Sequence, residues 1–298
     1  MFTSDSMIRP RARLIPLLFA LLPISFLFAA DSTNDPGQNT ASPGVTALKT
    51  APALKQTPVD FNHPPRAYVE HAAQGWRVFV EKELEDQNPD LSAKALARLD
   101  TKLAAMIAVL PGSALPDLRK VNLFIMYGPK ATGGGRKSGL EFFRTSSPKF
   151  NGWLDPRMAS SIVVFDAANY AALSDLWALK VLLHEFGHAH HLEHWPEKRI
   201  DMYDAWDHAI KTGLYQTVRD EDKGKPIVNY AAQNHLEYFA ELTAMYFARA
   251  NYFPYDRAGL KAYDPQGYAL IEKLWKVNET KPPVPQPSST QGALDSSK

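Results

Sequence analysis

The stretch VLLHEFGHAHH, residues 181–191, carries the strongest structural and chemical signal in the chain. It contains the motif HExxH, formed by His184, Glu185 and His188, in a segment whose apolar residues recur at helical spacing. Residues four apart are neighbours on one helix face, so the two histidines can present their imidazoles to one metal ion. Glu185, turned by about 100° from His184, can take a proton from a metal-activated water without being a ligand. The stretch therefore predicts a zinc site on a helix, with Glu185 as general base.

The alternative interpretation of this stretch is a polar surface helix on which histidines gather. Its apolar residues Leu182, Leu183 and Phe186 argue against full exposure. The remaining histidines near the motif are expected at the surface or behind the ligands, not bound to the metal. They are His190, His191, His194 and His235.

A hydrolytic zinc site needs a third protein ligand, and two candidates lie downstream. His194 stands at the offset of the third histidine in the HExxHxxGxxH pattern, but His191 occupies the place where that pattern has its turn glycine. The second candidate is Glu237, which begins the run EYFAE and has Glu241 four residues later. Two acids on one face of an otherwise apolar helix need a buried positive partner, such as a metal with its imidazole ligands. An acid placed by the helix dipole is the alternative for Glu237.

With HEFGH followed by EYFAE, the sequence resembles the gluzincin clan of zinc metallopeptidases, and within it the catalytic domain of anthrax lethal factor and its relatives. The resemblance implies that Glu237 is the third zinc ligand and that Glu241 orients a ligand histidine. It also implies that Tyr230, seven residues before Glu237, helps polarise the substrate carbonyl; a structural tyrosine is the alternative. The resemblance covers about residues 160–250, whereas 61–159 do not match that toxin. It implies no toxin activity, host target or delivery partner.

Composition excludes several classes of protein. The chain has 298 residues, of which 45% are hydrophobic and 22% charged, as in an ordinary globular protein rather than a disordered one. A net charge of +1 provides no basic field for nucleic acid, which is not expected as a partner. The chain has no cysteine, so disulfides, thiolate nucleophiles and cysteine-bound zinc are excluded. A metal must therefore be bound by His, Asp or Glu.

The first 30 residues predict a secretory signal peptide. Arginines at positions 9, 11 and 13 precede an apolar run from Leu14 to Phe28, and two alanines follow. The alternative is an uncleaved membrane anchor, but the run is shorter than the about 20 residues of a span and contains Pro16 and Pro23. We expect a secreted or periplasmic protein with no stable membrane anchor after cleavage.

The remaining sequence predicts one catalytic domain, 61–279, of the α+β class. Residues 31–60 resemble a flexible linker, with a pro-segment as the alternative, and 280–298 form a Pro- and Ser-rich tail. The resemblance implies a zincin-like domain, with a small mixed sheet packed on the active-site helix and a mainly helical C-terminal half. Strands are expected at 76–80, 121–127, 139–143 and 161–165, and helices at 96–110, 173–192, 201–211, 234–249 and from Asp264 onward.

Residues and resemblance together predict an exported zinc metalloendopeptidase with one Zn²⁺ per chain and a peptide or protein substrate. The strand at 161–165 is either an edge strand that pairs with an extended peptide or a central core strand. Two other functions stay open at this point. They are hydrolysis of cell-wall or other non-protein amides, and a non-catalytic metal-binding module.

Overall fold

The computed structural model describes residues 66–144 and 154–277. The predicted signal peptide, linker and C-terminal tail lie outside these residues. Within the described ranges, no helix combines the length and the apolar character that a membrane span requires.

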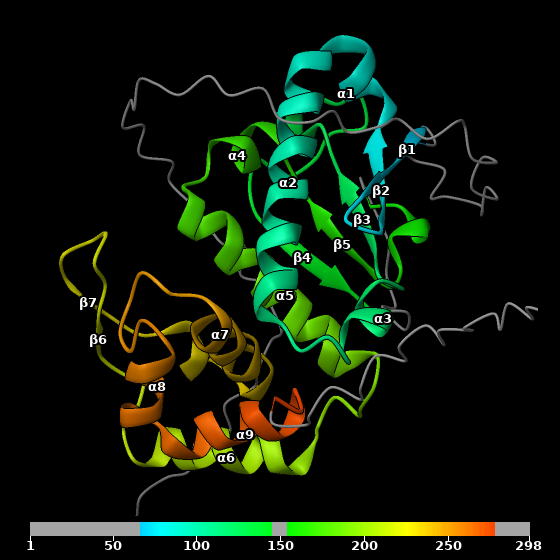
Figure 1. The fold of residues 1–298 in the computed structure, drawn as a ribbon. Coiled ribbons are helices and arrows are strands. Elements are labelled where there is room, and N and C mark those ends of the chain that lie inside the picture. The colour runs from blue at the N-terminus through cyan, green and yellow to red at the C-terminus, as the bar shows by residue number, and fades with distance from the viewer. Residues whose placement is uncertain (1–65, 145–153, 278–298) are drawn as a thin grey trace, which may run out of the picture.

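Five strands form one mixed sheet, in the order β1-β2-β3-β5-β4 (Figure 1). The three central strands are parallel to one another, and each edge strand is antiparallel to its neighbour. The strands are β1 (Tyr68–Ala73), β2 (Trp76–Glu81), β3 (Asn122–Ile125), β4 (Leu140–Phe143) and β5 (Ser161–Val164).

The position of β5 decides between the two interpretations of the strand at 161–165. This strand lies between β3 and β4, and all four of its residues are buried, as is typical of a central parallel strand. The core interpretation is therefore confirmed and the edge interpretation is wrong. The edge strand beside the HExxH helix is β4 instead.

Two helices cover one face of the sheet, α2 (Pro89–Val109) and α5 (Asp175–Leu192). The helix expected at 96–110 begins earlier, because Asn88 caps the backbone N–H of Leu91 and Pro89 occupies the first turn. Shorter helices connect these elements: α1 (Lys82–Gln87), α3 (Leu115–Leu118) and α4 (Ala167–Ala172). The opposite face of the sheet carries a small aromatic core that includes Phe79 and Phe124.

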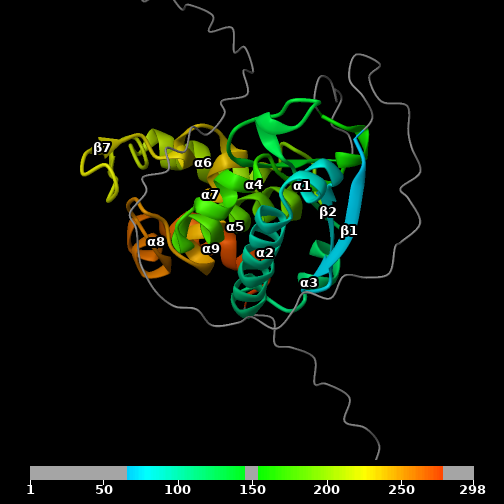
Figure 2. The ribbon, with the colours of Figure 1, turned by 90° about the horizontal axis from the view of Figure 1, so that it is seen from above.

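The C-terminal half is helical and lies on the far side of α5 from the sheet, as both views show (Figures 1 and 2). Its helices are α6 (Ile200–Lys211), α7 (His235–Phe247), α8 (Arg257–Tyr263) and α9 (Pro265–Leu274). A short hairpin of β6 (Val218–Arg219) and β7 (Pro226–Ile227) separates α6 from α7. The expected N-cap Asp264 accepts a hydrogen bond from Gly267 N, with Pro265 at the first helical position.

The α+β class with a small mixed sheet is confirmed, and the expected elements differ mainly at their ends. The helix expected at 173–192 is present as α5, which begins two residues later because Ser174 is its N-cap, whereas the short helix α4 before it, capped by Asp166, was not expected. Strand β1 was not expected, since five of its six residues are only half-buried and give no alternating pattern. It pairs with β2 through a tight turn in which Gln74 and Gly75 both have positive φ.

Candidate metal centre

Helix α5 places two of the three candidate ligands. Ser174 accepts a hydrogen bond from Trp177 N and starts the helix, whose middle turns are buried between the sheet and the C-terminal helices. His184 and His188 lie one turn apart, and their Nε2 atoms are 3.1 Å apart. The side chain of His184 is 5% exposed and that of His188 12%, so both imidazoles are largely buried.

Helix α7 contributes the third candidate ligand, Glu237. The side chain of Asn234 accepts hydrogen bonds from the N–H groups of Leu236 and Glu237 and so fixes the first turn of α7. Glu237 Oε2 lies 3.1 Å from His184 Nε2 and 3.2 Å from His188 Nε2. The structure thus brings these three predicted ligands to one point.

A glycine allows the two helices to approach. A Cβ atom at Gly187 would lie 3.1 Å from the Cα atom of Ala240 on α7. That is closer than ordinary van der Waals contact between carbon atoms, about 3.5–4.0 Å. The absence of a side chain on Gly187 therefore sets the helix separation at which Glu237 reaches both histidines.

The donor atoms have the spacing that a tetrahedral metal ion needs. Ligands about 2.0–2.1 Å from a tetrahedral zinc lie about 3.3–3.4 Å from one another, close to the observed separations. In the described part of the chain, His184, His188 and Glu237 are the one group of metal-ligating side chains that meets this kind of spacing. The group could hold a metal ion, and its imidazole and carboxylate donors suit zinc and other first-row divalent cations.

The electrostatics of the group also call for a positive charge. Burial opposes a charged imidazole, but the carboxylates of Glu237 and Glu241 outweigh it and raise the pKa of His184 to about 10. Burial also opposes ionisation of Glu237, yet the two imidazoles hold the pKa of this carboxyl far below its ordinary value. Without a metal, the negative charges of Glu237 and Glu241 are therefore partly balanced by a protonated His184, which lies between the two carboxylates.

Glu185 points from α5 toward the edge strand. Its Oε2 accepts a hydrogen bond of 2.8 Å from the backbone N–H of Phe142 on β4. The residue is 7% exposed, and burial raises the pKa of its carboxyl to about 7. A carboxylate with this pKa can both accept and return a proton near neutral pH.

Glu241 lies behind His184, on the side away from the other donors. Its Oε1 is 3.0 Å from His184 Nδ1, and the residue is buried. Burial would raise the pKa of Glu241, but Lys180, His184 and Tyr252 outweigh burial and lower it to about 2. The predicted contact between Glu241 and a ligand histidine is therefore present in the structure.

Tyr230 lies beside the cluster, in a short 3₁₀ helix, Tyr230–Ala232, just before α7. Its ring centroid is 5.9 Å from that of His184, with the two planes inclined at 36°. Burial and the neighbouring carboxylate of Glu237 raise the pKa of Tyr230, so its hydroxyl keeps its proton at neutral pH. The protonated phenol therefore lies beside the carboxylate of Glu237, with which it interacts.

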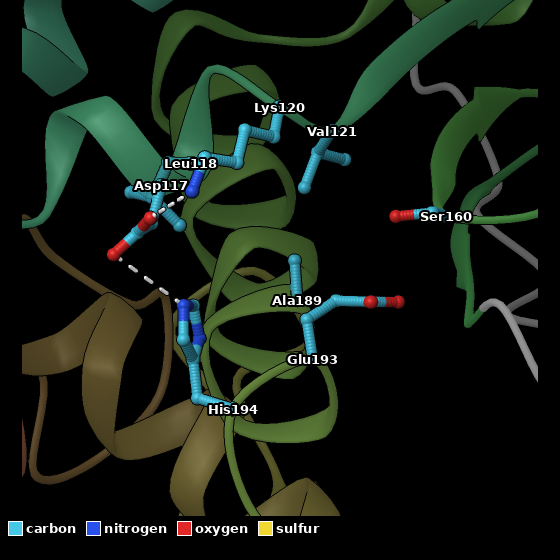
Figure 3. Close-up of a pocket in the computed structure, with 8 residues that line it drawn as sticks. All are labelled: Asp117, Leu118, Lys120, Val121, Ser160, Ala189, Glu193 and His194. Atoms are coloured by element: carbon cyan, nitrogen blue, oxygen red, sulfur yellow. Dashed lines mark hydrogen bonds and ion pairs between the residues drawn. The ribbon is translucent and has the colours of Figure 1, made fainter.

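The structure brings none of the other histidines of this region to the three donor atoms. His190 stacks on a tryptophan ring, and His191 is fully buried rather than at the surface. His235 contacts the carbonyl of Glu197. His194, the alternative third ligand, instead lines a pocket at the C-terminal end of α5, where its Nε2 lies 3.6 Å from Asp117 Oδ2 (Figure 3).

Two members of the site were not predicted, Lys180 and Tyr252, which both contact Glu241. Lys180 could have been found, because it is one turn before His184 and interrupts an apolar helix face. Tyr252 carries no sequence signal, since its place depends on the loop after α7. No protein-family model matches the chain, and no curated protein shows significant similarity to it.

Proposed function

We propose that this protein is a zinc-dependent metallopeptidase of the gluzincin type, with zinc held by His184, His188 and Glu237. The observation that carries the proposal is the meeting of these three donors from α5 and α7, with the buried carboxylate of Glu185 beside them. A structural zinc site is usually closed by four protein ligands. Three ligands beside a carboxylate with a raised pKa favour a catalytic site.

Glu185 and Tyr230 have different roles in the proposed hydrolysis of a peptide bond. When bound, zinc supplies Lewis acidity toward a water molecule and a carbonyl oxygen. Glu185 accepts a proton from the attacking water and delivers it to the leaving nitrogen. The protonated hydroxyl of Tyr230 donates a hydrogen bond to the developing oxyanion.

The edge strand supports a peptide as the substrate. Within the described residues, strand β4 pairs only with β5, and the backbone N–H of Phe142 points away from that pairing to Glu185. An extended peptide added to this outer edge would run past the general base. The export predicted from residues 1–30 belongs to this proposal, as does a protein or peptide substrate outside the cytoplasm.

Metal content and proteolysis of one set of variants test the proposal. Protein beginning at residue 31 should contain one zinc per chain by mass spectrometry and should cleave an unstructured protein such as casein. Glu185→Gln should keep zinc and lose activity, whereas Glu237→Ala should lose both. Glu193→Gln, an exposed acid directly after α5, is the control and should change neither.

Each other outcome has a distinct meaning. Cleavage of muropeptides but not of casein would move the substrate to cell-wall amides. Stoichiometric zinc without hydrolysis of any substrate would leave a metal-binding module. Normal turnover by Glu185→Gln would refute the proposed mechanism.

A further inference from the structure

A lysine is buried directly behind the candidate metal centre. Lys180 lies on α5, one turn before His184, and is 1% exposed. Its ammonium donates a hydrogen bond of 2.6 Å to the hydroxyl of Tyr252 and lies 3.2 Å from Glu241 Oε1. The rings of Trp177 and Tyr252 flank the ammonium, with centroids at 4.6 and 4.3 Å. A buried ammonium is unfavourable unless it is paired in this way.

Glu241 connects this lysine to the ligand histidine. Its Oε1 lies near both Lys180 Nζ and His184 Nδ1, and its Oε2 accepts a hydrogen bond from the hydroxyl of Tyr252. Both carboxylate oxygens are therefore held, so the group cannot rotate without breaking a contact. A carboxylate fixed at Nδ1 keeps the proton of a neutral imidazole on that nitrogen and leaves Nε2 free to bind a metal.

Backbone contacts to the β6–β7 hairpin hold Tyr252 in place. Tyr252 forms an isolated β-bridge with Asp220, and Phe253 N donates to the carbonyl of Arg219, so this segment is tied to the β6–β7 hairpin. The acidic groups that face Lys180 are Glu241, Asp220 and Asp222; they oppose the lowering of its pKa by burial. The charge of Lys180 thus has partners on α7 and on the hairpin.

We propose that Lys180 and Tyr252 are positioning residues, which hold the carboxylate of Glu241 against Nδ1 of His184 and so fix the imidazole in the orientation that binds the metal. The inference rests on the proposed function only for the identity of the metal. Neither residue reaches the three donor atoms, so both act through Glu241. Outer contacts of this kind are commonly worth 10- to 100-fold in metal affinity, about the effect expected here.

Zinc affinity, measured by competition with a chromophoric chelator, tests the proposal on the whole protein. Tyr252→Phe keeps the ring and removes one hydrogen bond, and should weaken zinc binding by about 10-fold. Lys180→Met should weaken it by about 10- to 100-fold. The controls are Tyr170→Phe, a buried tyrosine on α4, and Lys102→Met, a lysine on α2 paired with Asp175. Both controls should leave the affinity unchanged, even where they lower stability.

A double-variant cycle separates positioning from general stability. In a Glu241→Gln background, Lys180→Met should change zinc affinity by less than about 2-fold, because the carboxylate through which Lys180 acts on His184 is already absent. This double variant also removes both buried charges, so it should fold if Lys180→Met alone does not. An equal effect of Lys180→Met in both backgrounds would overturn the proposal.

A spectroscopic signal gives a second readout. In the zinc-loaded protein, the Nδ1 proton of His184 should give a downfield ¹H resonance that is protected from exchange, and Tyr252→Phe should speed its exchange. Unchanged affinity and unchanged exchange in Tyr252→Phe would overturn the proposal while leaving the peptidase function intact. Wild type that binds zinc without hydrolysing peptides would refute the proposed function alone, and wild type that binds no zinc would refute both.

Discussion

Replacing Glu185 by glutamine should make the metal-free protein more stable above pH 7. Burial raises the pKa of this carboxyl from 4.5 to about 7. Between these two pH values the folded protein holds the proton more tightly than the unfolded chain does, so this group lowers stability as the pH rises through that window. At about 1.4 kcal/mol per pH unit, the full cost above pH 7 is about 3 kcal/mol. Glutamine cannot ionise and can still accept the hydrogen bond from Phe142 N.

Urea denaturation after removal of metal by a chelator, at pH 5 and at pH 8, measures this difference. We expect Glu185→Gln to exceed wild type by about 3 kcal/mol at pH 8 and by about 0.8 kcal/mol at pH 5. The control Glu193→Gln should stay within about 0.5 kcal/mol of wild type at both pH values. Added zinc should shrink the gain at pH 8, because a cation beside Glu185 stabilises its charged form. Equal stability of Glu185→Gln and wild type at pH 8 would refute the reasoning.

Three further predictions concern the metal and the helix pair that holds it. Because the carboxylates raise the pKa of His184 to about 10, zinc must displace a proton from this imidazole when it binds. The apparent affinity for zinc should therefore fall about 10-fold per pH unit from pH 8 to 6. Calorimetry in two buffers that shows no proton release would contradict this prediction. Gly187→Ala should crowd the backbone of α7 at Ala240, lower stability by about 1–3 kcal/mol and weaken zinc retention; unchanged affinity would show that the helix separation does not set the site. His194→Ala should keep its full zinc content by mass spectrometry, since His194 faces Asp117 instead, and zinc loss would reopen its place as third ligand.

The parts of the site that depend on local spacing could be predicted from the sequence. His184 and His188 follow from helical geometry, and the pairing of Glu237 with Glu241 follows from the same period on a second apolar helix. That the two helices meet was implied by resemblance alone, and the structure places all four side chains together.

The parts that depend on long-range contacts could not be predicted. Phe142 belongs to an expected strand, but its position beside Glu185 depends on the order of the strands in the sheet. That order could not be predicted, because the central strand β5 and the edge strand β4 have similar apolar patterns. Tyr252 reaches Glu241 through the β6–β7 hairpin, whose strands have only two residues each and leave no periodic pattern.

The close packing of α5 and α7 would also make a bound metal ion a probe of how the molecule opens. The candidate ligands on α5 and the candidate ligand on α7 are separated along the chain by α6 and the hairpin, and they meet only when the C-terminal half is docked. Any motion that lifts α7 from Gly187 withdraws Glu237 from the histidines before the sheet needs to change. The rate at which a strong chelator captures zinc would then measure the lifetime of the docked C-terminal half, a local opening that equilibrium unfolding of the whole domain does not resolve.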